Sequence, residues 1–469
     1  MGGRAEKLDD LAAGEWRKVS HYDLLIIGAG SGNSIIDERH DEWNIAIVEP
    51  GEFGGTCLNR GCVPSKMFIY AADRAYMAKT NERFGIETTF VNARWPEIRD
   101  RVFDRIDPIT ESGLDYRMSL PNVTVYRNMA RFIGERTFQI GEEIVTAEQV
   151  VVAAGARPEI PNIPGLDQVP YVTSDEIMRI SDLPSHLVIV GGGFIAVEMA
   201  HIFSSFGSEV TIIHRGSHLL RGLDSDISNR ITDIYKKRFN LLLETEVDNV
   251  DHDKDFKLNL STGETIECDE LLISTGRTPN TDQLNVSEGN IEITNSGHIA
   301  TNSFLQASAE GVWAIGDITN PIQLKHLANA DARIVGHNIC NPQNLLSVDR
   351  SLSPAAVFGY PPIASVGLTE QQAAAEKISY LVASRSFADT AYGWAMEDET
   401  SFIKLLADPE NRTLLGAHLI GPQSPTLIQQ LIQGMTLGQT VDEMGREQLY
   451  IHPALPEVVE QALLEFEMK

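Results

Sequence analysis

The sequence is poor in cysteine and lacks long apolar runs. Only 4 of its 469 residues are cysteines, which is too few for a disulfide-stabilised scaffold and is typical of a reducing compartment. No stretch approaches the roughly 20 apolar residues that cross a membrane, and residues 1–20 lack the apolar core of a secretory signal. We therefore expect a cytoplasmic protein with a short polar extension over residues 1–20 and no membrane partner.

Basic residues are scarce as well. The chain has 38 lysines and arginines against 66 aspartates and glutamates, a formal net charge of −28. This balance argues against a nucleic-acid partner, although a local basic pocket for a phosphate remains possible. The hydrophobic fraction of 42% is that of a globular protein. At about 150 residues per domain, the length predicts about three domains.

Two of the four cysteines, Cys57 and Cys62, lie close together in GGTCLNRGCVPSK, residues 54–66. They are either a redox-active pair or two buried thiols near the start of a helix. An offset of five residues places side chains about 140° apart on a straight helix, whereas a disulfide needs Cα atoms within about 7 Å. A bridge therefore requires a distorted turn, for which Gly61 supplies the conformational freedom.

The segment before this pair has the pattern of a nucleotide-binding unit. An apolar run over residues 22–27 predicts a buried strand, and a glycine turn, a helix-like segment and a second strand ending at Glu49 follow. Glycines let the backbone approach a pyrophosphate, and a carboxylate at the second strand accepts a ribose hydroxyl. The third fingerprint position is Asn33 instead of glycine, which predicts looser packing of helix against strand. The turn glycines are Gly28, Gly30 and Gly32.

The pattern returns in HLVIVGGGFIAVEMA, residues 186–200, which predicts a second nucleotide unit. Its fingerprint positions are Gly191, Gly193 and Ala196. The following strand ends in His214 and Arg215 instead of an acid. A cation at this point suits the 2′-phosphate of NADPH, whereas an acid would suit NADH. We expect Arg215 and Arg221 to hold that phosphate; the alternative is two exposed arginines on a loop.

Three further apolar strands, within residues 150–158, 271–280 and 311–317, each end in a turn and are expected to complete the nucleotide units. From about residue 347 the composition changes, and no third glycine fingerprint appears. We expect this last part to be an α/β domain of another kind. Near its end lies HPALPE, residues 452–457, which by itself is more often a helix cap than a catalytic motif.

The ordered motifs resemble the pyridine nucleotide-disulfide oxidoreductases, the group of glutathione reductase and dihydrolipoamide dehydrogenase, from residue 21 onward. The motifs are GAGSGN (28–33), GGTCLNRGCVPSK (54–66), AAGARP (153–158), GGGFIAVE (191–198), GRTPN (276–280), AIGD (314–317) and HPALPE (452–457). The resemblance implies an α/β fold with two Rossmann-like dinucleotide-binding domains, for FAD and NADPH, and a C-terminal α+β dimerisation domain. The implied parts are an extension (1–20), the FAD domain (21–155 and 276–346), the NADPH domain (156–275) and the dimerisation domain (347–469).

The resemblance also implies catalytic roles. Cys62 faces the flavin as the charge-transfer thiolate, and Cys57 attacks the substrate disulfide. Only a thiolate is nucleophilic, so Cys57 needs a base, a task that fits His452 with Glu457 as the carboxylate that orients it. In this family the histidine serves the partner subunit's disulfide, which implies an obligatory homodimer. Lys66 and Glu198 match an ion pair beside the flavin.

The remaining residues that match the family's motifs are implied cofactor contacts. The implied set is Gly28, Gly30, Ser31, Gly32, Glu49, Gly55, Thr56, Gly155, Gly191, Gly193, Phe194, Ile195, Arg215, Arg221, Gly276, Asp317 and His326. Phe194 replaces a gating tyrosine of glutathione reductase and lacks its hydroxyl. Lys325 and His326 replace a Thr-Pro pair, which leaves their side-chain roles open. We expect no metal ion.

Within the family, four segments look most like the branch that reduces mycothiol disulfide: GSGNSIIDERH, RVFDRIDPI, YGWAMEDE and IHPALPEVVEQALL. Glutathione reductase shares the redox machinery and is the nearest alternative. Dihydrolipoamide dehydrogenase would need an acid at His214. Mercuric reductase and large thioredoxin reductase need a further C-terminal redox pair, and soluble transhydrogenase lacks the redox cysteine. A redox-sensing flavoprotein without enzymatic activity is the alternative from another class.

Overall fold

The computed structural model describes residues 19–468, so residues 1–18 of the predicted extension lie outside it. The chain divides into two compact units. The first holds the chain up to Gly55, Ser112–Ala156 and Pro279–Val348. The second holds Thr56–Glu111, Arg157–Thr278 and the chain from Asp349. The finer division into FAD, NADPH and dimerisation domains stays a prediction.

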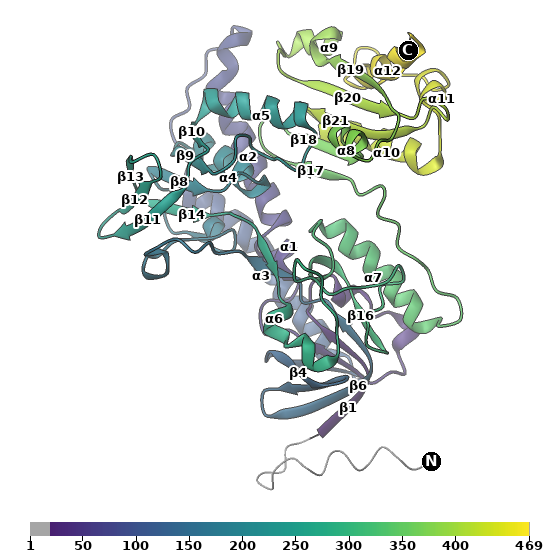
Figure 1. The fold of residues 1–469 in the computed structure, drawn as a ribbon. Coiled ribbons are helices and arrows are strands. Elements are labelled where there is room, and N and C mark those ends of the chain that lie inside the picture. Colours follow the sequence, from purple (N-terminus) through teal and green to yellow (C-terminus); the bar gives the residue numbers. More distant parts are fainter. Residues whose placement is uncertain (1–18, 469) are drawn as a thin grey trace. The chain divides into compact units, whose positions relative to one another are not determined.

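A seven-stranded sheet forms the first unit (Figure 1). Its strands are β1 (Val19–Ile27), β2 (Ile45–Val48), β3 (Val123–Tyr126), β4 (Ala130–Gly134), β5 (Thr137–Ile140), β6 (Glu143–Val152) and β16 (Val312–Ala314). The order is β3-β2-β1-β6-β5-β4, with β16 also paired to β6. The pairs among β1, β2, β3, β6 and β16 are parallel, whereas β4 and β5 are antiparallel additions.

The second half of β1, residues 24–27, is a continuous apolar run because it is buried on both faces of the sheet. Leu25 and Ile27 of β1 lie in the hydrophobic core on one face of the sheet. Leu24 and Ile26 lie in the core on the other face, together with residues of α7 (Lys325–Cys340). Since successive side chains of a strand point to opposite faces, a strand that is buried on both sides has no polar positions.

The helix that we predicted after the first glycine turn is absent from the described structure. Two short 3-10 helices replace it, η1 (Gly32–Ser34) and η2 (Glu38–His40). Arg117 accounts for the interruption, because its Nη2 donates to the Asn33 carbonyl at 2.6 Å and its Nε to Asn33 Oδ1 at 2.7 Å. Asp37 then caps η2, so the chain restarts instead of continuing an i to i+4 ladder.

The second unit contains the other predicted nucleotide unit. Its four-stranded parallel sheet has the order β10-β9-β8-β14. The strands are β8 (His186–Val190), β9 (Glu209–His214), β10 (Asn240–Leu243) and β14 (Glu270–Ile273), and α4 (Phe194–Phe206) and α5 (Ser225–Arg238) connect them. Beside them lies the antiparallel sheet of β11 (Val247–His252), β12 (Phe256–Leu260) and β13 (Thr265–Cys268).

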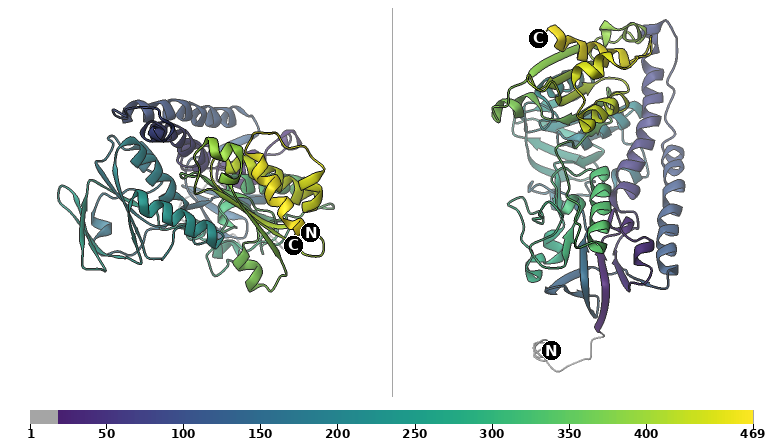
Figure 2. Two further views of the ribbon diagram at one scale, coloured as in Figure 1. Left: turned by 90° about the horizontal axis from the view of Figure 1, so that it is seen from above. Right: turned by 90° about the vertical axis from the view of Figure 1, so that its right-hand side faces the viewer.

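The C-terminal part of the second unit is a five-stranded antiparallel sheet. Its strands are β17 (Ala355–Val357), β18 (Ile363–Gly367), β19 (Leu381–Ser386), β20 (Phe402–Ala407) and β21 (Leu414–Ile420), in the order β17-β18-β21-β20-β19. Helices α10 (Ser424–Leu437) and α12 (Pro456–Leu464) share one core with this sheet and cover the same face of it (Figure 2).

Further elements are the 25-residue helix α3 (Trp95–Ser119) and the short helices α6 (Thr281–Leu284), α8 (Glu370–Ala375), α9 (Ala391–Ala395) and α11 (Val441–Arg446). The strands β7 (Ala156–Pro158) and β15 (Arg277–Pro279) pair with each other. The predicted fold class, α/β with two dinucleotide-type sheets and a different C-terminal domain, is confirmed. Within residues 19–468, no helix combines the length and the apolarity that crossing a membrane would require.

Candidate functional site

The cysteine pair lies at a break between two helices. Cys57 is in α1 (Gly55–Asn59), and Cys62 begins α2 (Cys62–Thr80). At Gly61, between the helices, a Cβ atom would lie 2.9 Å from the Thr56 carbonyl oxygen and 3.3 Å from the Cys57 Cα. No other residue fits so close to backbone. The expected distorted turn is therefore confirmed, and Gly61 is what permits it.

The two thiols differ in environment. Cys57 is half-buried, whereas Cys62 is exposed at the start of α2. A helix N-terminus carries unpaired N–H groups and favours negative charge, so the position of Cys62 suits a thiolate. This asymmetry agrees with two thiols of different function.

Lys66 and Glu198 meet through a third residue, Phe358. The Lys66 ammonium lies 4.0 Å from the centre of the Phe358 ring, and the Phe358 N–H donates to Glu198 Oε1 at 2.9 Å. In residues 19–468, no direct ion pair joins Lys66 to Glu198. The prediction of a direct ion pair is therefore wrong: the two charges attract each other only at longer range, and the Phe358 N–H stabilises the carboxylate.

The charge of Glu198 is finely balanced. Burial raises the pKa of this carboxyl to about 7, and the Phe358 N–H and the Lys66 charge oppose that rise. Burial likewise lowers the pKa of Lys66, against the fields of Asp73 and Glu198. A carboxyl that titrates near neutral pH beside an ammonium is typical of a functional site.

His452 and Glu457, the predicted acid–base pair, lie within hydrogen-bond distance of each other. His452 Nδ1 lies 2.7 Å from Glu457 Oε1, and the Ala454 N–H donates to the other carboxylate oxygen at 3.3 Å. The histidine side chain is 72% exposed, whereas the glutamate side chain is only 15% exposed. The carboxylate therefore fixes the imidazole through Nδ1 and leaves Nε2 directed to the outside.

The first glycine turn has the geometry of a dinucleotide cradle. A Cβ atom on Gly28 (φ +107°) would lie 2.3 Å from the Ala153 carbonyl oxygen, so only glycine fits. Glu49, directly after β2, accepts from the Ala29 N–H at 2.8 Å and from the Gly51 N–H at 2.9 Å. Glu49, the predicted ribose ligand, is thus hydrogen-bonded to the glycine turn that is predicted to hold the phosphates. This arrangement fits FAD.

Two details of this turn differ from expectation or extend it. The looser packing predicted at Asn33 is wrong, because Gly32 provides the close approach one residue earlier: its Cβ would lie 2.7 Å from the Ala153 Cβ. Lys325, whose role the sequence left open, donates to Ser31 Oγ at 2.9 Å and so brings a cation to the turn. A cation here suits a pyrophosphate.

The second glycine turn repeats the cradle with a longer helix behind it. A Cβ atom on Gly191 (φ +142°) would lie 2.3 Å from the Ser274 carbonyl oxygen. Gly193 is the N-cap of α4 and offers no side-chain cap, so the first N–H groups of α4 point to where a phosphate would bind. Phe194 is 47% exposed beside it and Ile195 is half-buried. These residues fit a nicotinamide dinucleotide.

The predicted 2′-phosphate residues gather at the carboxyl end of β9. Arg215 and Arg221 are both exposed, and Arg221 Nε lies 3.1 Å from the position of a Cβ on Gly216. The His214 ring lies against Gly192 and Gly216. Burial lowers the pKa of His214, and the positive charges of Arg221 and Arg215 lower it further.

From the sequence, His214 served only to show that no acidic residue stands at the end of this strand. Its Nε2 is buried without a hydrogen-bond partner among residues 19–468, which makes His214 a further polar group beside the two arginines. Its position at the end of a strand was the signal that pointed there.

The other predicted cofactor residues lie in glycine turns and at or near the starts of helices. Gly155 follows β6 and Gly276 follows β14, both with positive φ. Gly30 and Gly55 face each other, since a Cβ on Gly55 would lie 2.8 Å from the Gly30 Cα. Thr56 is in α1, Asp317 in the 3-10 helix Gly316–Ile318, and His326 at the start of α7.

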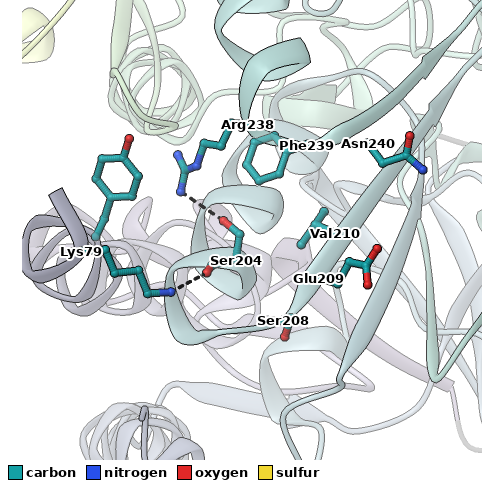
Figure 3. A pocket seen from close by; sticks show the side chains of 9 residues that line it. Lys79, Ser204, Ser208, Glu209, Val210, Arg238, Phe239 and Asn240 are labelled. Carbon is teal, nitrogen blue, oxygen red and sulfur yellow. Dashed lines mark hydrogen bonds between the residues drawn. The ribbon is translucent and has the colours of Figure 1, made fainter. Parts of the chain in front are cut away.

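A cavity of about 450 Å³ lies away from these residues (Figure 3). Lys79 and Arg238 meet there at Ser204, where Lys79 donates to the carbonyl at 3.1 Å and Arg238 to the hydroxyl at 3.1 Å. None of the predicted redox or cofactor residues lines this cavity. The candidate site is therefore defined by the motif residues and not by this cavity.

Family comparisons match nearly the whole chain. Residues 22–332 match the model for "Pyridine nucleotide-disulphide oxidoreductase" and residues 353–463 the model for the dimerisation domain of the same family. A mycothione reductase of Mycobacterium tuberculosis is 47% identical over 94% of this chain and 99% of its own length. A mercuric reductase of Bacillus cereus is 30% identical over 95% of this chain and 72% of its own length.

Solved structures agree. The HOCl-induced flavoprotein disulfide reductase RclA of Escherichia coli superimposes with a TM-score of 0.83 at 27% identity. The match covers 94% of this chain and 99% of that protein.

Proposed function

This chain belongs to the pyridine nucleotide-disulfide oxidoreductases, and we propose that it is an NADPH-dependent reductase of mycothiol disulfide. Membership confirms the predicted enzyme class, NAD(P)H-dependent disulfide reduction with FAD. The bound cofactors supply the electron pair. In the overall reaction, one disulfide, one NADPH and one proton give two thiols and one NADP⁺. The remaining steps fall to side chains of this chain.

Cys57 and Cys62 carry the exchange. The thiolate of Cys57 attacks one sulfur of the substrate and releases the first thiol, which leaves a mixed disulfide on Cys57. Cys62 then attacks the Cys57 sulfur, which forms the Cys57–Cys62 disulfide and releases the second thiol. This disulfide is reduced by the electron pair from NADPH, which restores the two thiols. The helix break at Gly61 supports this assignment, because it allows residues five apart to approach each other.

His452 moves the protons. In its neutral form it takes the proton of Cys57 at Nε2, and as imidazolium it returns a proton to the departing thiolate. The Glu457 carboxylate, 2.7 Å from Nδ1, stabilises that imidazolium. Because His452 is largely exposed and residues 353–463 match a dimerisation domain, we assign it to the site of the partner subunit in a homodimer.

The preference for NADPH rests on charge. Arg215, Arg221 and the uncharged His214 occupy the place where NADH enzymes hold an acid. The preference for mycothiol disulfide rests on the 47% identical mycothione reductase. A cytoplasmic location remains our prediction from the low cysteine content.

The test is turnover of the purified holoenzyme with mycothiol disulfide, glutathione disulfide and lipoamide, each with NADPH and with NADH. We expect mycothiol disulfide with NADPH to give the highest kcat/KM. A higher value for glutathione disulfide would replace the substrate assignment, and a higher value for NADH would remove the 2′-phosphate argument.

An anaerobic titration with NADPH tests the cysteine roles separately. Two electrons should produce a long-wavelength thiolate-to-flavin absorption band in the wild type. Cys57→Ser should lose disulfide reduction and retain flavin reduction by NADPH. Loss of flavin reduction in that variant would contradict the assignment, and a wild type without the band would have no active disulfide.

A further inference from the structure

The turn that carries Arg221 is anchored to the C-terminal sheet by a buried lysine, Lys404. This residue lies in the middle of β20 and its side chain is only 3% exposed. Its neighbours Ile403 and Leu405 point into the core shared with α10 and α12. Lys404 therefore points to the opposite face of the sheet, because side chains of a strand alternate.

Three carboxylates surround the Lys404 ammonium on that face. Its Nζ lies 3.0 Å from Asp224 Oδ1, 2.6 Å from Asp226 Oδ2 and 2.5 Å from Glu370 Oε2. Asp224 is fully buried, whereas Asp226 and Glu370 reach solvent. A buried carboxylate depends on its partners to remain charged, so Lys404 and Asp224 hold each other in place.

Asp224 is the N-cap of α5 and ends the turn of Arg221. Its Oδ1 accepts from the Asp226 N–H at 3.1 Å, and its Oδ2 accepts from the Glu370 N–H at 3.0 Å. Both oxygens of this carboxylate are thus engaged, Oδ1 by the helix cap and by Lys404, and Oδ2 by the Glu370 N–H. A shift of Asp224 would move the start of α5 and the turn before it.

A second residue of the C-terminal part holds the same turn. Gln371 Nε2 donates to the Leu223 carbonyl at 2.8 Å, and the Ser225 N–H donates to Gln371 Oε1 at 3.3 Å. At its other end the turn is tied to the predicted coenzyme loop, since the Leu220 N–H donates to the Gly192 carbonyl at 2.8 Å. Arg221 stands between these two attachments.

We infer that Lys404 is a positioning residue for recognition of the coenzyme 2′-phosphate, which it serves by fixing the turn of Arg221 through Asp224. The inference rests on the proposed role of Arg221. It adds that the C-terminal sheet supports the coenzyme site by holding the turn of Arg221. Binding linkage is reciprocal, so coenzyme bound at Arg221 also stabilises the contact to the C-terminal sheet.

The test compares 2′,5′-ADP with 5′-AMP, which differ only in the 2′-phosphate, in calorimetric titrations of the holoenzyme. In Lys404→Met we expect 2′,5′-ADP to bind about tenfold more weakly and 5′-AMP to change by less than about twofold. Lys404→Arg keeps the charge and the donors and should restore binding of 2′,5′-ADP. Lys236→Met removes an exposed lysine of α5 and should match the wild type.

Each outcome decides a separate point. A wild type that binds both probes equally would contradict the proposed NADPH preference, independently of Lys404. A wild type that prefers 2′,5′-ADP, with the same preference in Lys404→Met or an equal loss of both probes, would overturn the inference. If Lys404→Met does not fold, Gln371→Ala is the deciding variant. It should weaken binding of 2′,5′-ADP about threefold and leave binding of 5′-AMP unchanged. An unchanged ratio of the two affinities would overturn the inference.

Discussion

After the first glycine turn the chain makes only two short 3-10 helices, η1 and η2, whereas after the second turn it makes α4, a helix of 13 residues. Both turns follow an apolar strand and begin with a glycine whose Cβ would lie 2.3 Å from a carbonyl oxygen of a neighbouring strand's turn. The close glycine turn is therefore common to both units. The secondary structure that follows the turn differs.

The difference has a local cause. In the first unit Arg117 of α3 takes the Asn33 carbonyl, and Asp37 starts a new cap, so no continuous ladder forms. In the second unit the segment after Gly193 is rich in apolar helix formers and continues as a helix until Gly207 ends it. The helix persists although the Tyr235 hydroxyl also donates to the Val197 carbonyl at 2.9 Å. A glycine fingerprint thus predicts the turn, but the residues that follow it and the new cap at Asp37 decide whether a long helix forms.

The largest expected effect comes from adding a Cβ atom at the first glycine of either turn. Gly28→Ala would force a Cβ against the Ala153 carbonyl and Gly191→Ala against the Ser274 carbonyl. We expect Gly28→Ala to lose bound flavin entirely, and Gly191→Ala to keep flavin and lose NADPH binding. The absorbance of the purified protein measures its flavin content, and a titration with NADPH measures coenzyme binding.

A helical glycine provides the matched control. A Cβ on Gly113 of α3 would meet nothing within 4 Å. Gly113→Ala should therefore keep both cofactors and unfold with a free energy higher by about 1 kcal/mol. If Gly28→Ala retained flavin as this control does, the close approach at the first turn would not be required for binding.

The next effect concerns the helix that only the second turn has. Glu198 is buried on α4, and its pKa is raised from 4.5 to about 7. A raised pKa contributes stability below pH 4.5 that is lost as the pH rises through 7. Relative to Glu198→Gln, the wild type should lose about 3 kcal/mol of unfolding free energy between pH 4.5 and pH 8. Denaturant unfolding across this range measures it; a difference independent of pH would show that Glu198 does not titrate there.

The sequence predicted the strands and turns better than it predicted what lies between them. The strands at 22–27 and 186–190 and the glycine positions follow from local patterns that hold in any context. The His452–Glu457 pair and the helix break at Gly61 were also predictable, because neighbours in sequence form them.

The misses involve contacts between distant residues. Arg117 lies 84 positions from Asn33, and Phe358 stands between Lys66 and Glu198 from 160 positions beyond Glu198. A single sequence carries no signal for such pairs. The same holds for Lys325 at Ser31 and for Lys404 at Asp224.

A smaller effect tests whether the two cradles differ in coenzyme chemistry. The first turn is served by the Glu49 carboxylate and the second by Arg215 and Arg221. The double substitution Arg215→Gln and Arg221→Gln should raise the KM for NADPH about thirtyfold, or about 2 kcal/mol, since it removes charged hydrogen bonds to a phosphate. The KM for NADH is the internal control. Equal changes for both coenzymes would mean that neither arginine reads the 2′-phosphate.

The smallest effect addresses the interrupted helix itself. Arg117→Met removes the two hydrogen bonds to Asn33 and keeps much of the apolar stem of this buried side chain. The freed Asn33 carbonyl should weaken the packing of the first turn and lower flavin affinity about fivefold, or about 1 kcal/mol. NADPH affinity should not change, because the hydrogen bonds of Arg117 go to the first turn. The exposed Arg131→Met is the control. Flavin release on heating reports the difference, and if Arg117→Met bound flavin more tightly, the bond to Asn33 would be a restraint on the cradle instead of a support.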